Sequence, residues 1–288
     1  MMPDTASPKV LRELLQRYQF RIKKKFGQNF LIDGNIINNI VTVAEVNNED
    51  LVIEIGPGAG ALTTRLAQLA RQVVAVEIDP GAIAMLTEVL APQNNVHVVQ
   101  GDALKVDLDA LATQENFATY KVVANLPYYI TTPLLMHLLE QSKKVNTIVV
   151  MVQEEVARRL AASPGSKDYG ALTLAADYYA QVSLAFKVPR SVFMPRPEVD
   201  SAVVCLKVRE TPEVHVKEKQ VLFALIKAAF QQRRKTLLNS LNTIGELSKE
   251  QRLQIFEQAG IDPVRRGETL SLAEFSHLAE IFTEFLRR

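Results

Sequence analysis

Residues 51–61 read LVIEIGPGAGA, an apolar β-branched run that passes directly into a glycine-rich turn. An apolar run of this length is typical of a strand covered on both faces, and the glycines let the backbone turn sharply into a helix beside a ligand. Similar runs at 72–79, 95–102, 120–126 and 146–152 follow it, most of them separated by helical patterns. This alternation predicts an α/β fold built from strand–helix–strand units around a parallel sheet.

The chain changes character toward its C-terminal end. The runs VSLAFKV (182–188) and SAVVCLKV (201–208) have no helix-length segment between them, so we expect antiparallel neighbours at one edge of the sheet. Beyond about residue 210 the pattern is helical, with glycines at the breaks. We predict an N-terminal extension at 1–20, mobile except for one short amphipathic helix, an α/β domain at 21–210 and a small all-helical domain at 211–288.

Composition excludes several classes of protein. Lys and Arg number 33 against 32 Asp and Glu, so any attraction to nucleic acid must come from local clusters of charge. The single cysteine, Cys205, excludes disulfides within the chain and a thiolate metal cluster. The N-terminal residues lack the apolar stretch of a signal peptide, and no run reaches the length of a membrane span. We expect a soluble, cytoplasmic protein.

The glycine turn and two acids indicate a nucleoside site. Gly56, Gly58 and Ala61 also satisfy a loose dinucleotide fingerprint, so the turn alone leaves an NAD site open. Glu77 ends the next strand, where a carboxylate can accept the two hydroxyls of a ribose. Asp102 ends the third strand and can accept a hydrogen bond from an adenine amino group, although a turn cap would use the same residue. Together they predict a nucleoside along the carboxyl edge of the sheet.

The fourth strand ends in NLPYYI, residues 125–130. The side-chain oxygen of Asn125 and the carbonyl of Leu126 can accept the two hydrogens of an exocyclic amine and orient it for attack. Pro127 restricts the backbone there, and Tyr128 offers a ring for a base to stack on. A base reached in this way must have left its helical stack. The alternative is an ordinary turn with both tyrosines in the core.

A second aromatic residue can complete this site. Phe193 begins the stretch FMPRPEVDS, whose prolines stiffen the connection between the two edge strands and present the ring at a fixed orientation. The alternative is a proline-rich connection without a role in binding.

The ordered set KKFGQNFLID, EIGPGAG, VVAVEID, GDAL, NLPYYI and FMPRPEVDS resembles the KsgA-type small-subunit ribosomal RNA adenine dimethyltransferases, over nearly the whole chain from about residue 21. The resemblance implies a Rossmann-like class I S-adenosylmethionine-dependent methyltransferase fold: a mostly parallel seven-stranded sheet with an antiparallel edge strand, and a helical C-terminal domain. It implies S-adenosylmethionine as the cofactor, needs no metal, and argues against NAD. The family's cofactor contacts fall on Asn29, Leu31, Gly56, Glu77, Asp102 and Asn125. Its residues that hold and flank the target adenine fall on Asn125, Leu126, Pro127, Tyr128 and Phe193.

The resemblance also implies a substrate. In that family the targets are two adjacent adenosines in the 3′-terminal hairpin of small-subunit (16S) ribosomal RNA, each of which we expect to receive two methyl groups on N6. The implied partner is this RNA within the 30S particle or its precursor, with a role in subunit biogenesis, and we expect a monomer. A sister family that modifies large-subunit RNA and confers macrolide resistance, a protein acting chiefly as a ribosome-assembly factor, and a DNA adenine methyltransferase are the alternatives.

Two basic clusters are candidates for phosphate contact. The first is Arg21, Lys23, Lys24 and Lys25, and the second is Arg233, Arg234 and Lys235. Neutralising several phosphates would make RNA binding fall steeply with salt. The alternative is a solvated charged face, which short runs of this kind often form.

Overall fold

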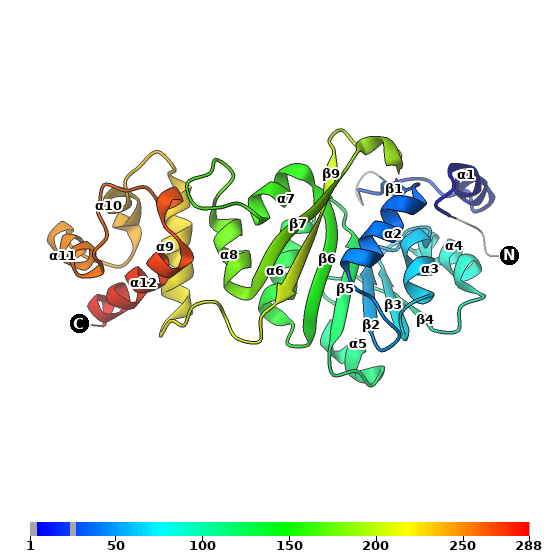
Figure 1. Ribbon diagram of the computed structural model, residues 1–288, viewed down its shortest axis with the longest axis horizontal. Coiled ribbons are helices and arrows are strands. Elements are labelled where there is room, and N and C mark those ends of the chain that lie inside the picture. The colour runs from blue at the N-terminus through cyan, green and yellow to red at the C-terminus, as the bar shows by residue number, and fades with distance from the viewer. Residues whose placement is uncertain (1–4, 24–26, 288) are drawn as a thin grey trace. The chain divides into compact units, whose positions relative to one another are not determined.

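The computed structural model of the protein describes residues 5–23 and 27–287 and divides the chain into two compact units (Figure 1). The first unit comprises the chain up to Ala157 together with Val182–Val208, and the second comprises Arg158–Gln181 and the chain from Arg209 onward. Within the described ranges, no helix combines the length and the apolar character needed to cross a membrane.

The first unit is built on a seven-stranded sheet. Its strand order is β4 (Val96–Gln100), β3 (Gln72–Glu77), β2 (Leu51–Ile55), β5 (Tyr120–Asn125), β6 (Val145–Gln153), β9 (Ser201–Val208) and β7 (Ala180–Val188). The first five strands of this order are parallel to one another, and β9 runs antiparallel to β6. The predicted parallel sheet with an antiparallel addition is confirmed; the antiparallel strand lies between β6 and the edge strand β7.

The strand order places a topological switch point between β2 and β5. Successive strands run outward from β2 through β3 to β4, and the chain then crosses to the other side of β2 to form β5 and β6. In open α/β sheets, ligands bind outside the carboxyl ends of the strands at such a point. The sheet therefore directs attention to the residues that follow β2 and β5.

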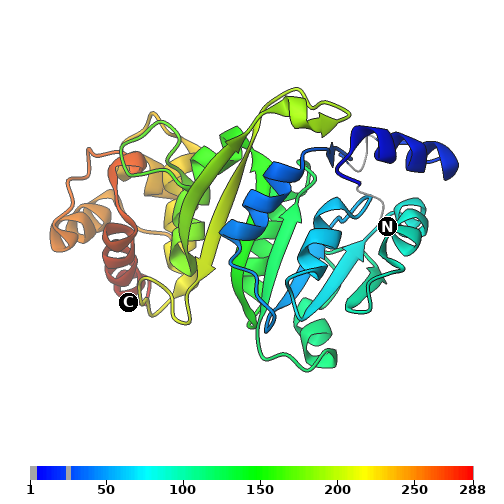
Figure 2. The same cartoon turned by 45° about the vertical axis from the view of Figure 1, so that its right-hand side comes forward.

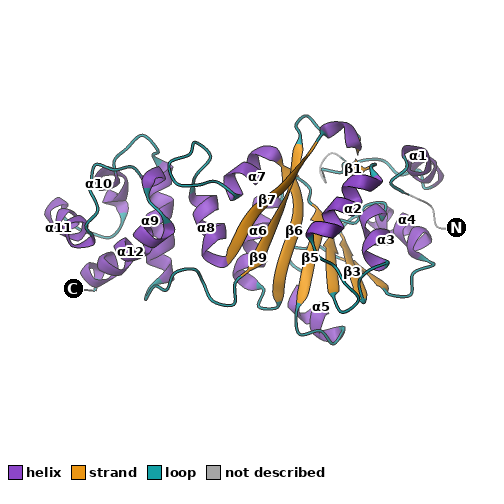
Figure 3. Cartoon of the chain, in the orientation of Figure 1, coloured by secondary structure: helices purple, strands orange, loops and turns teal. Residues whose placement is uncertain are grey.

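Helices cover both faces of the sheet, as the views in Figures 2 and 3 show. All five residues of β2 are buried, as expected for a β-branched strand with two covered faces. On one face, Ile40 of α2 (Gly34–Val43) and Leu66 of α3 (Ala61–Ala67) join one apolar cluster with side chains of the central strands. The other helices of this part of the chain are α4 (Pro80–Leu90), α5 (Leu108–Gln114), α6 (Thr131–Gln141) and α7 (Glu154–Leu160), and the boundary between the two units falls within α7.

The described part of the N-terminal segment, from residue 5 onward, is packed onto the first unit, where we expected a mobile extension with one short amphipathic helix. Its helix α1 (Pro8–Arg17) has Leu11 and Leu14 on one face, and both are almost completely buried. Leu14 packs against Leu86 and Leu90 of α4, while Leu11 packs against Phe30. The three-residue spacing of the leucines places them on the same side of the helix, which explains why α1 docks.

A small two-stranded sheet joins segments that are distant in sequence. Strand β1 (Phe30–Leu31) pairs antiparallel with β8 (Phe193–Met194), so that Leu31 lies opposite Phe193. A short helical turn, η2 (Arg190–Val192), leads into β8. The pairing fixes the GQNFL segment that precedes α2.

The second unit is helical around its own apolar core. It contains α8 (Ala171–Tyr179), α9 (Lys219–Gln231), α10 (Leu237–Ser240), η3 (Leu241–Thr243), α11 (Lys249–Ala259), η4 (Gly267–Thr269) and α12 (Leu272–Leu286). Tyr169, Leu174 and Tyr178 belong to the same cluster of buried residues as the core of α9 and α12. The helical unit is thus built from two separate segments of the sequence. It includes residues 158–181, whereas the sequence predicts that these belong to the α/β domain.

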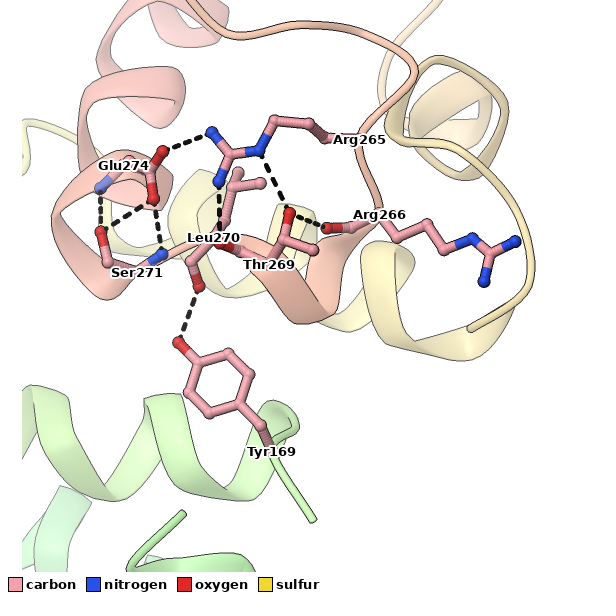
Figure 4. Close-up of polar contacts among 7 residues, drawn as sticks. All are labelled: Tyr169, Arg265, Arg266, Thr269, Leu270, Ser271 and Glu274. Carbon is pink, nitrogen blue, oxygen red and sulfur yellow. Dashed lines mark hydrogen bonds and ion pairs between the residues drawn. The ribbon is translucent and has the colours of Figure 1, made fainter. Parts of the chain in front are cut away.

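Polar contacts fix the loop that leads into α12 (Figure 4). The guanidinium group of Arg265 donates to Oε1 of Glu274 at 2.5 Å and to the carbonyl of Thr269 at 2.7 Å. Ser271 and Glu274 form a reciprocal capping box at the start of the helix. The hydroxyl of Tyr169 donates to the carbonyl of Leu270 at 2.8 Å, which ties the segment 158–181 to this loop.

The Tyr169 hydrogen bond gives a prediction for stability. Tyr169→Phe leaves the buried carbonyl of Leu270 without this donor, so we expect the free energy of unfolding of the helical unit to fall by about 1–2 kcal/mol. Chemical denaturation monitored by circular dichroism measures the change. Tyr129→Phe is the matched control, because no hydrogen bond joins the Tyr129 hydroxyl to the described residues, and its effect should stay within about 0.5 kcal/mol. Equal effects of the two substitutions would contradict this role for Tyr169.

Candidate active site at the carboxyl ends of the parallel strands

A cavity of about 400 Å³ lies at the carboxyl ends of β2, β3, β4 and β5. This volume lies within the range of small-molecule sites in proteins. The cavity is lined by residues from the ends of these four strands and from the GQNFL segment, including all of the predicted cofactor contacts: Asn29, Leu31, Gly56, Glu77, Asp102 and Asn125. Parallel strands bring their carboxyl ends to one edge of a sheet, which explains why residues so distant in sequence meet here.

The glycine turn after β2 has a backbone that only glycine adopts readily. Gly56 and Gly58 have φ angles of 70° and 58°, in the left-handed region. A Cβ atom at Gly58 would also lie 3.0 Å from the ring of Phe30. The turn therefore packs closely against β1, and its backbone forms the floor of the cavity beside α3.

Glu77 is held by backbone donors at the end of β3. Its Oε2 accepts from the N–H of Gly58 at 3.2 Å, and its Oε1 accepts from the N–H of Asp79 at 2.9 Å. The residue is only 6% exposed, and this burial raises the pKa of its carboxyl group against the opposing effect of the backbone donors. The carboxyl group is thus fixed in orientation on the cavity wall, where further lone pairs of its oxygens can accept hydroxyl groups.

Asp102 combines the two roles that the sequence left open. Its Oδ1 accepts from the N–H of Leu104 at 3.1 Å, which is the turn-capping arrangement. Within the described part of the chain, Oδ2 receives no hydrogen bond, and the residue lines the cavity. One oxygen therefore positions the side chain, and the other can accept from a ligand.

Asn125 ends β5 with its amide group in a fixed orientation. The side-chain nitrogen Nδ2 donates to the backbone carbonyl of Asn29 at 2.9 Å. A carboxamide has donors on nitrogen and lone pairs on oxygen, so this bond identifies Oδ1 as the atom left to accept. Neither Oδ1 nor the carbonyl oxygen of Leu126 accepts a hydrogen bond from the residues that the structure describes, and both residues line the cavity.

The two tyrosines of NLPYYI have different environments. The hydroxyl of Tyr128 lies 2.7 Å from Oγ of the buried Ser201 at the start of β9, which anchors the ring at the cavity. Burial raises the pKa of Tyr128. Tyr129 also lines the cavity but remains 53% exposed. Both tyrosines therefore lie at the cavity and not in the core, which was the alternative interpretation of this turn.

Phe193 does not lie with Tyr128 in this structure. The residue is 3% exposed and belongs to the apolar cluster that contains Leu31 and Val203. It is not among the residues that line the cavity. The pairing of β8 with β1 accounts for the difference, because it turns the ring into the core, a consequence that the proline pattern around it does not reveal.

The first basic cluster has a structural role at its one lysine that the structure describes. Nζ of Lys23 lies 2.8 Å from Oδ1 of Asp79, whose side chain is completely buried, and Nε2 of Gln28 donates to Oδ2 at 3.0 Å. Burial would raise the pKa of Asp79, but these donors and the N–H of Gly81 outweigh it and lower the pKa. Lys24 and Lys25 lie outside the described residues, and Arg21 is exposed.

The second basic cluster also divides into two groups. The guanidinium of Arg233 donates to the carbonyls of Lys167 and Tyr169, at 3.0 and 2.8 Å, and so holds the loop before α8. Arg234 and Lys235 are exposed, and their side chains have no partner in the ranges that the structure describes. These two cations, and not Arg233, are available to a phosphate.

Glu54 also lines the cavity, and it is not among the residues predicted from the sequence. It lies within the buried strand LVIEI, is 2% exposed, and its Oε2 has no hydrogen-bond partner among the described residues. Burial raises its pKa to about 8. A lone carboxylate inside an otherwise apolar strand is a signal that could have identified it. Among the same residues, no group of three or more His, Cys, Asp or Glu side chains is placed to hold a metal ion.

Fold and cavity together define a doubly wound α/β protein with a nucleoside-sized site at its switch point. A family model described as ribosomal RNA adenine dimethylase matches residues 19–284, and the chain belongs to this family of methyltransferases. The resemblance inferred from the motifs is confirmed.

Named relatives agree with this assignment over the full length of the chain. Proteins called ribosomal RNA small subunit methyltransferase A from Geobacillus kaustophilus and Pelotomaculum thermopropionicum are 49% and 50% identical, and each alignment covers 97% of both chains. Among solved structures, a dimethyladenosine transferase from Plasmodium falciparum matches with a TM-score of 0.74 at 27% identity, over 86% of this chain and 95% of the other. The 23S rRNA methyltransferase ErmE matches with a TM-score of 0.69, also at 27% identity, over 88% of this chain and 99% of the other.

The buried Glu54 predicts a specific pH dependence of stability. In the unfolded chain its pKa is near 4.5, and in the folded protein it is about 8, so between these values only the folded state holds the proton. Unfolding then releases a proton, and stability falls as pH rises, by about 1.4 kcal/mol per pH unit at most. Glu54→Gln removes this dependence, so its thermal midpoint should rise relative to the unmodified protein between pH 5.5 and pH 8.

The matched control for this measurement is Glu140→Gln, because Glu140 is an exposed carboxylate on α6. We expect its thermal midpoint to track that of the unmodified protein at both pH values. If the thermal midpoints of Glu54→Gln and the unmodified protein differ by the same amount throughout this pH range, Glu54 is ionised in the folded state.

Proposed function

We propose that the protein transfers methyl groups from S-adenosylmethionine to N6 of two adjacent adenosines in the 3′-terminal hairpin of small-subunit ribosomal RNA, two to each, during small-subunit biogenesis. The observation that carries this proposal is the orientation of Asn125. Its amide nitrogen is engaged by Asn29, and its oxygen and the Leu126 carbonyl remain to accept at the cavity.

The residues around the cavity fit S-adenosylmethionine. The unpartnered oxygen of Glu54 is a buried acceptor, suited to a cationic ligand that carries an ammonium and a sulfonium group. Glu77 is placed to accept ribose hydroxyls, and Asp102 offers one free oxygen to the adenine amino group. The family assigns Asn29 and Leu31 to the methionine end, and both line the cavity. When bound, the cofactor supplies an electrophilic methyl group on a positively charged sulfur.

The acceptor amine is held by two oxygens. The lone pair of an adenine amine is delocalised into the ring, so it is a weak nucleophile until its hydrogens are fixed. Oδ1 of Asn125 and the carbonyl of Leu126 accept the two hydrogens, and Pro127 limits the movement of that carbonyl. Alkylation makes the nitrogen acidic, so its proton can leave to water without a strong base. A second transfer uses the one hydrogen that remains.

The base itself rests on Tyr128. Its ring is anchored through Ser201 and lies at the cavity, where a base that has left its stack can pack against it. A stacking role for Phe193 stays a prediction: it requires the ring to become accessible from its present buried position beneath the β1–β8 pair.

Sequence identity favours the small-subunit RNA as the substrate. The relatives named for the small subunit are 49% and 50% identical over nearly the whole chain, whereas the 23S methyltransferase is 27% identical. The fold alone would not separate the two substrates, because the dimethyladenosine transferase from Plasmodium falciparum is also 27% identical. The large-subunit alternative is therefore not favoured.

The helical unit supplies cations for RNA contact. Arg234 and Lys235 are exposed in the turn that follows α9, where they can neutralise phosphates of the small-subunit RNA in the 30S particle or its precursor. We infer that the first unit is the catalytic domain, that the helical unit contacts the RNA, and that the protein acts in the cytoplasm as a monomer.

Transfer of radiolabel tests the proposed function directly. The protein is incubated with methyl-labelled S-adenosylmethionine and undermethylated small subunits, and the RNA is digested to nucleosides. We expect label in N6,N6-dimethyladenosine from small-subunit RNA. Label found only when large subunits are supplied would reject the small-subunit substrate, and label in duplex DNA would reject an RNA substrate.

Asn125→Ala tests the residue on which the proposal depends. Removing a positioned acceptor from the reacting amine should lower kcat about 100- to 1,000-fold in the label-transfer assay. Glu140 does not line the cavity, so the Glu140→Gln enzyme should keep its full rate. A rate for Asn125→Ala within threefold of the unmodified enzyme would mean that another group holds the amine.

The two groups of the second basic cluster, Arg233 on the one hand and Arg234 with Lys235 on the other, should respond differently to substitution. Combined Arg234→Ala and Lys235→Ala should weaken binding to small-subunit RNA. The slope of the logarithm of the binding constant against the logarithm of the salt concentration should become shallower, by the amount expected for about two lost phosphate contacts. The matched control, Lys143→Ala with Lys249→Ala, removes the same charge from exposed positions elsewhere. Arg233→Ala should mainly lower the thermal midpoint, because it breaks bonds to the loop before α8. Equal salt slopes for the first pair and its control would contradict the assignment.

A further inference from the structure

The N-terminal segment contributes a side chain to the cavity. Thr5 lies among the lining residues, although the family model begins to match only at residue 19. No motif in the sequence of this segment indicates a role in binding. Its contribution therefore lies outside the part of the chain that the family model describes.

The hydroxyl group of Thr5 is buried without a partner. The residue is 2% exposed, and Oγ1 has no hydrogen-bond partner among the described residues. A buried hydroxyl that forms no hydrogen bond is unfavourable, and native proteins rarely retain one without a use. Because Thr5 lines a cavity built for a polar ligand, a bound molecule is the natural partner for this oxygen.

The position of Thr5 identifies the part of the ligand that it meets. The adjacent Ala6 belongs to the apolar cluster that contains Leu31 and Leu62, two residues that line the cavity near the glycine turn. Asp102 and Leu104, in contrast, line it from the turn that follows β4. Thr5 thus lies on the side of the cavity formed by β1 and α3. Under the proposed function, this side holds the amino-acid end of the cofactor.

The segment is held firmly enough for Thr5 to act as a fixed contact. Leu11 of α1 packs with Phe30 and Ala59, and the ring of Phe30 is also the group that contacts Gly58. The phenol of Tyr18 donates to Glu88 of α4 at 2.5 Å. Helix α1 therefore connects the glycine turn to α4 through packed side chains, and Thr5 lies just before its first turn.

We propose that the hydroxyl group of Thr5 forms a hydrogen bond with the α-amino-acid group of bound S-adenosylmethionine, which makes the N-terminal segment part of the cofactor site. This inference rests on the proposed function, since it takes S-adenosylmethionine as the ligand. Thr5 contributes binding and positioning and takes no part in the chemistry at the methyl group.

Calorimetric titration of the full chain with S-adenosylhomocysteine tests the inference, because it measures binding without turnover. Thr5→Val removes the hydroxyl at nearly constant shape and should weaken binding about three- to tenfold, as expected for one hydrogen bond. Thr5→Ser keeps a hydroxyl and should bind within twofold of the unmodified protein. The matched control is Ser7→Ala, which removes a hydroxyl that caps nothing and does not line the cavity, and it should leave affinity unchanged.

A smaller ligand localises the contact. 5′-Methylthioadenosine lacks the amino-acid group, so its affinity should be the same for Thr5→Val and the unmodified protein. The thermal midpoint of free Thr5→Val should be equal or higher, because no hydrogen bond is lost in the absence of ligand. If Thr5→Val does not fold, Thr5→Ala provides the same comparison.

Two results would overturn the inference. Equal affinity of Thr5→Val and the unmodified protein for S-adenosylhomocysteine would show that the hydroxyl does not contact the ligand. An equal loss of affinity for S-adenosylhomocysteine and 5′-methylthioadenosine would show that Thr5 acts on the shape of the cavity and not on the amino-acid group. Failure of the unmodified protein to bind S-adenosylhomocysteine would instead reject the proposed function.

Discussion

The hydrogen bond from Nδ2 of Asn125 to the backbone carbonyl of Asn29 is the constraint on which the site depends. A carboxamide at the end of a strand can rotate and offer either its donor or its acceptor, and only the acceptor can hold an amine. The bond removes that freedom, provided that the GQNFL segment stays in place. Pairing of β1 with β8 and the bond from Gln28 to the buried Asp79 keep it there. Two short segments far from NLPYYI thus determine which atom of Asn125 faces the cavity.

The sheet explains why the remaining groups converge on the same cavity. Its central strands are apolar and covered on both faces, so polar side chains gather where the strands end. Glu54 is the exception, a carboxylate within the strand itself. Burying this carboxyl group in its charged form is unfavourable, so it either stays protonated or pairs with a cation. A ligand with an ammonium or sulfonium group supplies such a cation. The same argument applies on a smaller scale to the hydroxyl of Thr5. Two unsatisfied atoms at the same cavity describe the ligand more closely than either does alone.

Much of this arrangement could be predicted from the sequence, because it follows from local patterns. Alternating strands and helices predict the parallel sheet, and parallel strands bring Gly56, Glu77 and Asn125 to one edge. Contacts between distant segments could not be predicted. Lys23 looked like a phosphate contact, but its partner Asp79 is buried 56 positions away. The helical pattern of residues 171–179 does not reveal which core the helix joins, and the proline pattern beside Phe193 does not reveal that its ring is buried. In each case the deciding partner lies elsewhere in the chain.

A crystal structure of the protein with S-adenosylhomocysteine and a small-subunit RNA hairpin would test the central claim most directly. The account predicts that N6 of the target adenine lies within hydrogen-bond distance of Oδ1 of Asn125 and the carbonyl of Leu126, while Nδ2 keeps its bond to Asn29. The adenine should stack on Tyr128. An adenine bound at this site with Nδ2 turned toward it and the bond to Asn29 broken would contradict the account.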